Sequence, residues 1–175
     1  PDGSVRRLDS IESTWQPIDE PTELAVAGID VPLVATDRGV YRIVDGSLRP
    51  AGLSDVRDVD ASGTPLAGTA SGLYELGNGW QLLAEGEING VSVGAVSEPD
   101  QLPRIHVVSG STLSAVEPSD TGGDADPAPL HPVASAADPL ADLDHGTSEY
   151  VYAISSTGTV LAAGPDEVRR HELGI

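Results

Sequence analysis

A motif built around a tight turn returns about every 40 residues along this chain, and this period limits the fold more than any other feature. Each copy places a small residue between two short apolar segments. The copies pivot on Gly3, Gly39, Gly72, Thr112 and Gly158. A period of this length made only of strands is typical of a β-propeller, in which one period forms one four-stranded blade. The sequence therefore predicts an all-β propeller with no helical segment.

The second full period shows the expected order of strands most clearly. Residues 56–60 alternate apolar and polar side chains, as an inner strand does, and residues 64–69 form a second, buried strand. Residues 73–76 alternate again, and Gly77-Asn78-Gly79 predicts a hairpin because Asn and Gly tolerate the positive φ of tight turns. Residues 80–83 then close the blade.

The neighbouring periods follow the same order, so we expect one propeller domain of about four and a half blades. Its parts are residues 1–18 (the outer half of a blade), 22–52, 54–85, 88–134 and 135–175. In the first full blade, strands are expected at 24–27, 32–36, 40–43 and 48–50, with Asp45-Gly46 as the hairpin. In the last blade, they are expected at 150–154, 160–162 and 168–170.

The half-blade at residues 1–18 indicates how large the complete ring is. A propeller closes on itself to remove its sheet edges. We therefore expect these residues to be part of a six- or seven-bladed ring in a longer chain. The alternative is a five-bladed ring whose half-blade is completed by something outside this sequence.

The charge of the chain predicts its surroundings. There are 28 acidic residues against nine basic ones, all arginine, which gives a net charge of −19. This excess opposes compaction in dilute buffer but keeps a protein hydrated in molar salt, where screening lengths fall to about 3 Å. The composition therefore predicts a halophilic protein; an acidic face that binds a basic partner is the alternative.

Composition also excludes several kinds of binding site and structure. Nucleic-acid binding needs a basic stripe that these few arginines do not provide. The chain has no cysteine, which excludes disulfides and thiolate metal sites. Its apolar runs have the length of strands and are interrupted by Gly, Pro or charge, so no membrane span is expected.

Several motifs carry a resemblance to a known family, most clearly over residues 33–86. They are Gly39-Val40-Tyr41-Arg42-Ile43, Val56-Arg57-Asp58-Val59, Pro65-Leu66-Ala67, Gly72-Leu73-Tyr74-Glu75-Leu76-Gly77-Asn78-Gly79-Trp80, Val151-Tyr152-Ala153 and Arg170-His171-Glu172-Leu173-Gly174. On these residues the chain resembles an uncharacterised haloarchaeal β-propeller family. The resemblance implies an archaeal protein, cytoplasmic and at high salt, with further sequence upstream. It brings no catalytic residues.

A fainter similarity links the chain to propellers whose blades carry the Asp-box hairpin, as in sialidases and photosystem assembly factors. It rests on Gly77-Asn78-Gly79-Trp80 and on Ser13-Thr14-Trp15. The Asp-box is a structural device. The arginine cluster, acid and tyrosine nucleophile of those hydrolases are not recognisable in this sequence.

Two motifs suggest catalysis but have a plainer interpretation. Gly90-Val91-Ser92-Val93-Gly94 has the spacing of a nucleophile elbow, which requires a strand that leads into a helix. Here the motif lies within a predicted inner strand, so we interpret the match as chance. His106 alternates with apolar neighbours and is interpreted as a strand histidine with satisfied hydrogen bonds.

The region 117–144 is rich in groups that bind divalent ions. They are Asp120, Asp124, Asp126, Asp138, Asp142, Asp144, His131 and His145. Their spacing does not fit an EF-hand loop. The Pro, Gly, Ala and Asp content instead predicts a solvated acidic insertion at 117–132. We therefore expect no metal site and no cofactor.

Arg57 and Asp58 are the candidate ligand-binding residues, because they lie together on a predicted inner strand. Arg57 is expected to pair with Asp55 or Asp58, or else to hold an anionic ligand through two hydrogen bonds. No acid, base and nucleophile converge in the sequence, so no catalytic residue is assigned. We therefore expect a non-enzymatic interaction platform for a protein partner. The alternative is a hydrolase or lyase that acts on a small anionic ligand at the channel mouth.

Overall fold

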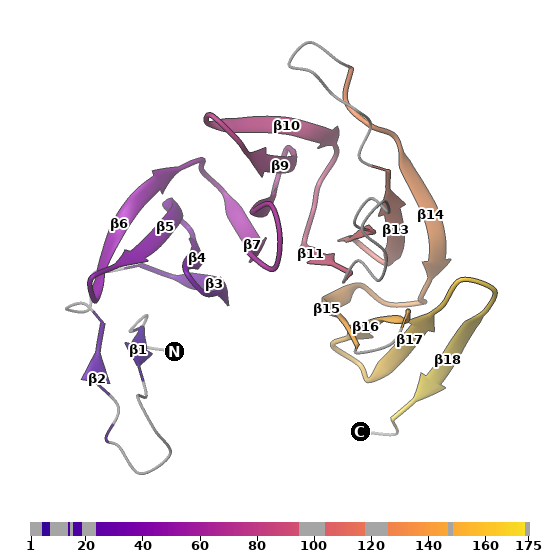
Figure 1. Ribbon diagram of the computed structural model, residues 1–175. Coiled ribbons are helices and arrows are strands. Elements are labelled where there is room, and N and C mark those ends of the chain that lie inside the picture. The colour runs from indigo at the N-terminus through magenta and orange to yellow at the C-terminus, as the bar shows by residue number, and fades with distance from the viewer. Residues whose placement is uncertain are drawn as a thin grey trace.

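The computed structural model describes residues 5–7, 14, 16–18, 24–94, 104–117, 126–146 and 149–173. Four four-stranded antiparallel sheets follow one another around an arc, each with its first strand on the concave side and its last strand on the convex side (Figure 1). No described residue is helical, and therefore none of them belongs to a helix long and apolar enough to cross a membrane. The predicted all-β fold of four-stranded blades is confirmed.

The strands follow the order expected of successive blades. The first sheet contains β3 (Val26–Asp30), β4 (Leu33–Thr36), β5 (Gly39–Val44) and β6 (Ser47–Gly52). The second contains β7 (Val56–Asp60), β8 (Leu66–Thr69), β9 (Gly72–Leu76) and β10 (Trp80–Glu85). The third contains β11 (Gly90–Val93), β12 (Ile105–Ser109), β13 (Thr112–Val116) and β14 (Leu130–Ser135). The fourth contains β15 (Leu140–His145), β16 (Val151–Ser155), β17 (Thr159–Ala163) and β18 (Val168–Glu172).

A short pair of strands precedes the first sheet. β1 (Arg6–Arg7) and β2 (Gln16–Pro17) run antiparallel and pair only with each other. They fall within residues 1–18, where the outer half of a blade is expected. Trp15, which carries part of the Asp-box similarity, lies outside the described residues.

The repeated turn between the second and third strands has a physical cause. Thr36 Oγ1 accepts a hydrogen bond from the backbone N–H of Arg38 (3.1 Å) and donates one to the carbonyl of Gly39 (2.8 Å). Thr69 makes the equivalent bonds to Ser71 and Gly72 in the second sheet. These hydroxyls satisfy backbone groups that the turn would otherwise leave buried and unpaired. Gly39 is required because it has a φ of 125° and because a Cβ there would collide with the carbonyl of Leu53.

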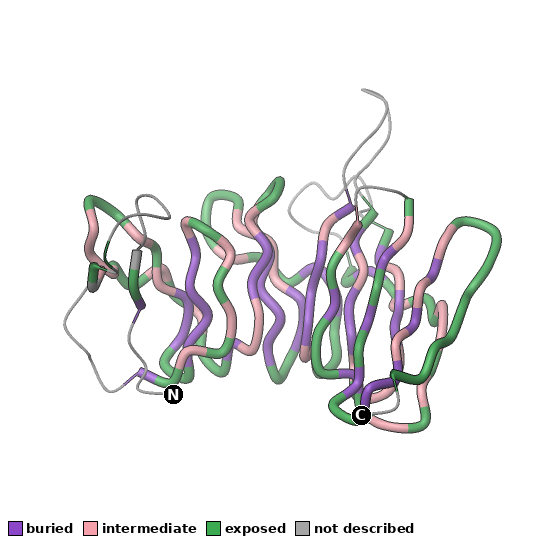
Figure 2. The backbone as a smooth tube through the Cα atoms, turned by 90° about the horizontal axis from the view of Figure 1, so that it is seen from below, coloured by how far each residue is buried: buried purple, intermediate pink, exposed green. Residues whose placement is uncertain are grey.

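The hydrophobic core lies between neighbouring sheets. Each of its three clusters joins two sheets: Leu33 of β4 packs in one cluster with Val59 of β7, for example, and Val108 of β12 packs in another with Leu143 of β15. In Figure 2 the buried segments follow the strands, and the turns at both ends are largely exposed. Each sheet therefore depends on its neighbour for burial.

Three expected segments differ from the structure. The inner strand of the first sheet runs from Val26 to Asp30 instead of 24–27, because it continues to a polar residue that bonds the next sheet. The expected insertion ends earlier than residue 132, since β14 begins at Leu130. The inner strand of the fourth sheet, β15, lies in the acidic region and was not predicted, because its aspartates conceal the strand pattern.

Candidate functional site

The inner strands present side chains to the neighbouring sheet at two equivalent positions. The strand registers align Gly28, Asp58, Gly90 and Asp142 at the first position and Asp30, Asp60, Ser92 and Asp144 at the second. An inner strand is a sheet edge, so its outward N–H groups need partners from elsewhere. Side-chain oxygens at these two positions accept hydrogen bonds from those N–H groups.

At the second position, a side-chain oxygen of one sheet accepts a hydrogen bond from the backbone N–H of the residue that directly follows the same position in the next sheet. Asp30 Oδ2 accepts from the backbone N–H of Ala61 at 2.6 Å, Asp60 Oδ2 from Val93 at 2.8 Å, and Ser92 Oγ from His145 at 3.2 Å. We call Asp30, Asp60 and Ser92 the junction acceptors. Because all three occupy one register position, the same bond joins each four-stranded sheet to the next one along the chain.

Asp58 adds a second bond at the junction of the second and third sheets. Its Oδ2 accepts from the N–H of Val91 at 2.9 Å. The pKa of Asp58 is raised to about 6, mainly by burial; the N–H groups of Val91 and Val59 oppose this shift, and the negative charges of Asp142 and Asp60 add to it. Gly28 leaves room for this carboxyl group, since a Cβ there would lie 2.6 Å from Asp58 Oδ1.

Arg57 does not pair with Asp55 or Asp58, so this part of the prediction was wrong. It forms an ion pair with Glu87, and both side chains are exposed to solvent. The cause is a β-bulge between Val56 and Asp58, which leaves Arg57 out of register with β8. The two candidate ligand-binding residues therefore take separate partners, and their role in ligand binding stays a prediction.

A cluster of three polar side chains lies at the junction of the third and fourth sheets. His145 Nδ1 is 2.9 Å from Ser92 Oγ, and His145 Nε2 is 3.0 Å from His106 Nδ1. Burial lowers the pKa of His106 to about 4, helped by the positive charges of His145 and Arg104. Burial also lowers the pKa of His145, although Asp60 and Asp144 oppose this. Burial therefore favours the neutral form of both imidazoles, and a neutral pair has a single N–H in this contact.

The nucleophile-elbow spacing has a packing explanation. A Cβ on Gly90 would lie 2.6 Å from Leu143 Cδ2, and one on Gly94 would lie 2.9 Å from the ring of His145. Both glycines thus admit side chains of β15, and Ser92 between them is only 4% exposed. The interpretation of His106 as a satisfied strand histidine agrees with its bond to His145, a partner that the sequence did not suggest.

The acidic region shows no convergence of metal ligands where the structure describes it. In those parts of the chain, no group of three or more His, Asp or Glu side chains could hold a metal ion. Asp120 and Asp124 lie outside the described residues. His131 lies on β14, whereas Asp142 and Asp144 lie on β15.

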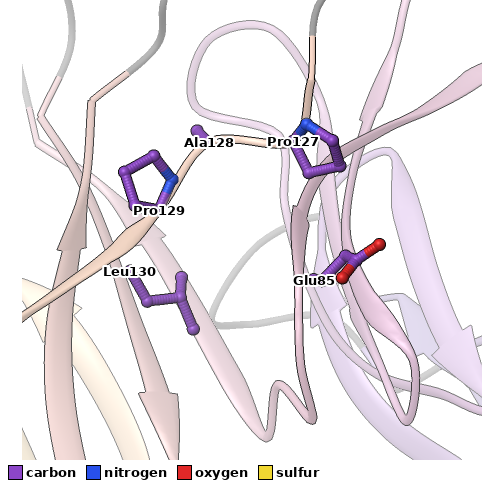
Figure 3. A pocket seen from close by; sticks show the side chains of 5 residues that line it. All are labelled: Glu85, Pro127, Ala128, Pro129 and Leu130. Carbon is purple, nitrogen blue, oxygen red and sulfur yellow. The ribbon is translucent and has the colours of Figure 1, made fainter.

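A shallow groove lies on the outer side of the second and third sheets. Its lining residues are Glu85, Pro127, Ala128, Pro129 and Leu130, and its volume is about 370 Å³ (Figure 3). Residues 126–129 cross from the third sheet to β10, where the N–H of Ala128 donates to the carbonyl of Leu83 at 2.7 Å. We call this segment the strap. Of the residues that line the groove, Glu85 alone has a titratable side chain.

One face of the fourth sheet is exposed at positions that are covered in the other sheets. Tyr152 is 42% exposed, whereas Leu33 and Leu66, which occupy its position in the first two sheets, are 2% and 1% exposed. Ile154 is 37% exposed, whereas its equivalent Val108 is fully buried. Asp142 and Asp144 beside them are exposed as well. We call these four residues the uncovered face.

The repeated sheets and their junctions define a β-propeller. The chain belongs to the family described as HVO_0234-like, beta propeller, whose model matches residues 1–175, so the resemblance to a haloarchaeal propeller family is confirmed. Among solved structures it is similar to the one titled "YCF48 bound to D1 peptide", with 16% sequence identity and a TM-score of 0.58. That match covers 95% of this chain and 58% of the other, and at this identity it shows the fold alone. No curated protein matches the sequence.

Proposed function

We propose that this propeller is a protein-interaction platform, and the uncovered face is the observation that carries the proposal. Tyr152 and Ile154 expose apolar surface at positions where each other sheet packs against a neighbour. Exposed apolar surface next to polar groups is a common mark of protein-binding sites. A β-sheet that covers this face, from a partner or from a part of the protein outside residues 1–175, would gain the hydrophobic contribution that the three existing junctions already have.

The junctions indicate what kind of partner fits. Asp144 occupies the position of the junction acceptors, and its carboxylate accepts no hydrogen bond from the described residues. A partner β-sheet that brings an unpaired backbone N–H to Asp144 and an aliphatic side chain to Tyr152 would repeat the existing geometry. The solved structure titled "YCF48 bound to D1 peptide" is a propeller with a bound peptide, so the fold is compatible with this role.

The alternative, an enzyme acting on a small anionic ligand, draws less support from the charges. The arginine expected to hold the ligand is paired with Glu87. Its inner-strand neighbours are carboxylates, and those of Asp60 and Asp142 are close enough to Asp58 to raise its pKa. An anion there would meet repulsion.

The experiment compares proteins recovered with the tagged chain from its natural cells in molar KCl. The test variant carries Tyr152→Glu and Ile154→Glu, and Val44→Glu, an equally exposed position on β5, is the control. We expect a companion protein, or a second copy detected by light scattering, with wild type and control but not with the test variant. Equal recovery with all three proteins, or no associated chain with any of them, would overturn the proposal. Circular dichroism checks that each variant is folded.

A further inference from the structure

The outer strands of the four sheets differ in how far their free edges are open. β6 contains Pro50 and β14 contains Pro132, and a proline removes a hydrogen-bond donor from an edge strand. The edge of β10 is covered in part by the strap, whose Ala128 occupies the carbonyl of Leu83 and is flanked by two prolines. These three edges are therefore poor templates for a further strand.

β18 is different, because it contains no proline and no described strand pairs with its outer edge. It pairs with β17 on one side only, and all five of its residues are exposed. The N–H of Leu173 bonds the carbonyl of Gly158, and the carbonyl of Glu167 accepts from Gly164, so odd-numbered residues face β17. The N–H and C=O groups of Val168, Arg170 and Glu172 therefore point outward.

β18 carries three basic side chains and one acidic side chain, that of Glu172. Arg169, Arg170 and His171 are consecutive in a protein of net charge −19. Successive side chains of a strand point to opposite faces, so Arg170 lies on one face and its two basic neighbours lie on the other. Both Arg side chains already rest beside exposed glutamates, Arg169 beside Glu167 and Arg170 beside Glu172 at 2.9 Å. These pairs are weak at the surface and can be exchanged for others.

We infer that the free edge of β18 binds an extended acidic segment of a partner protein, which adds a fifth strand to the fourth sheet. Main-chain hydrogen bonds to Val168, Arg170 and Glu172 supply the affinity, as in other cases of strand addition. Two adjacent acidic residues in the segment would meet Arg170 on one face and Arg169 or His171 on the other. This inference rests on the proposed function, that the propeller binds proteins, but it uses a surface other than the uncovered face.

A second copy of this chain fits the edge less well. The antiparallel self-pairing that uses all five residues of β18 is centred on Arg170. It sets Arg170 of one copy against Arg170 of the other. Like charges directly opposite each other destabilise a strand pair. An acidic partner strand replaces this repulsion by attraction, even though molar salt limits its range to about 3 Å.

The test is a binding titration of the whole chain in molar KCl with a short fluorescent peptide that has two adjacent glutamates between valines and threonines. Two matched peptides serve as controls, one with lysines for glutamates and one N-methylated at alternate backbone positions. We expect the acidic peptide alone to bind. Equal binding of the lysine peptide would overturn the choice of an acidic partner, and equal binding of the N-methylated peptide would overturn strand addition.

Two substitutions at one position separate backbone from charge. Arg170→Ala removes the charge, and Arg170→Pro also removes the outward N–H without breaking a bond to β17. We expect a few-fold weaker binding for the first and a further loss of at least about tenfold for the second. Equal affinities of the two variants would contradict the inference. The variant with Tyr152→Glu and Ile154→Glu should keep the peptide affinity, so failure of the proposed function and failure of this inference give different results.

Discussion

Ser92 and His145 join the third and fourth sheets twice. The Oγ of Ser92 accepts the backbone N–H of His145 at 3.2 Å and lies 2.9 Å from Nδ1 of the same residue. These residues are 53 positions apart in sequence. One small hydroxyl therefore fixes both the path of β15 and the orientation of an imidazole.

Loss of the Ser92 hydroxyl should weaken this junction. In Ser92→Ala the buried N–H of His145 loses its acceptor, which costs about 1–3 kcal/mol of unfolding free energy. Chemical denaturation in molar KCl measures the change. Ser156→Ala, at an exposed turn, is the control and should stay within about 0.5 kcal/mol of wild type. Equal stability of both variants would show that the hydroxyl is dispensable.

Asp58 should destabilise the protein above pH 6. Its pKa is about 6 in the folded chain and 3.8 ordinarily, so the folded state binds more protons between these values and stability falls as pH rises from about 4 to 6. Asp58→Asn keeps an acceptor for Val91 and removes the buried charge. We expect a gain of about 1–3 kcal/mol at pH 8 and no gain at pH 4. Asp166→Asn, at an exposed position, is the matched control; a loss of stability at pH 8 in Asp58→Asn would contradict the burial argument.

His106 should act in the opposite direction. Its pKa is lowered from 6.5 to about 4, so the unfolded chain binds the proton first, and stability present above pH 6.5 is lost as pH falls towards 4. His106→Gln should reduce this acid sensitivity by up to about 3 kcal/mol at pH 4. Denaturant unfolding at a series of pH values measures the free energy of unfolding of each protein. His171→Gln, on exposed β18, is the matched control. Identical pH slopes in wild type and His106→Gln would exclude this role.

A methyl group at Gly90 should strain the packing against β15. A Cβ there would lie 2.6 Å from Leu143 Cδ2, and overpacking of this kind costs about 1–3 kcal/mol. Gly63→Ala is the matched control, because nothing lies within 4 Å of its Cβ position. Thermal unfolding of the two variants compares them. Equal stability of Gly90→Ala and Gly63→Ala would show that the contact with Leu143 does not require glycine at position 90.

The fold could be predicted because its signals are local. Asp45 and Gly46 have φ angles of 50° and 74°, as the predicted tight hairpin requires, and the pivot at Gly39 has a φ that favours glycine. The junctions were harder to predict, because each bond joins residues about 30 to 50 positions apart. A signal was nevertheless present. Gly28-Ile29-Asp30, Asp58-Val59-Asp60, Gly90-Val91-Ser92 and Asp142-Leu143-Asp144 repeat an aliphatic residue before a side-chain acceptor.

The partner of Arg57 could not be found in the same way. A β-bulge at Arg57 shifts the register by one residue, and this shift is defined by the pairing with β8 and not by the residues of β7 alone. Glu87 is 30 residues further along the chain, beyond the three strands β8, β9 and β10. The sequence places Arg57 on the inner strand but does not show which acid it meets.

The junction acceptors have a consequence for how the molecule loses its structure. Each acceptor belongs to one sheet and its N–H donor to the next, and each core cluster likewise draws on two sheets. No sheet is thus complete by itself, and the unit of stability is a pair of neighbours, as in a one-dimensional array of coupled repeats. Damage to a single junction should loosen the sheets on both sides of it while distant pairs remain intact.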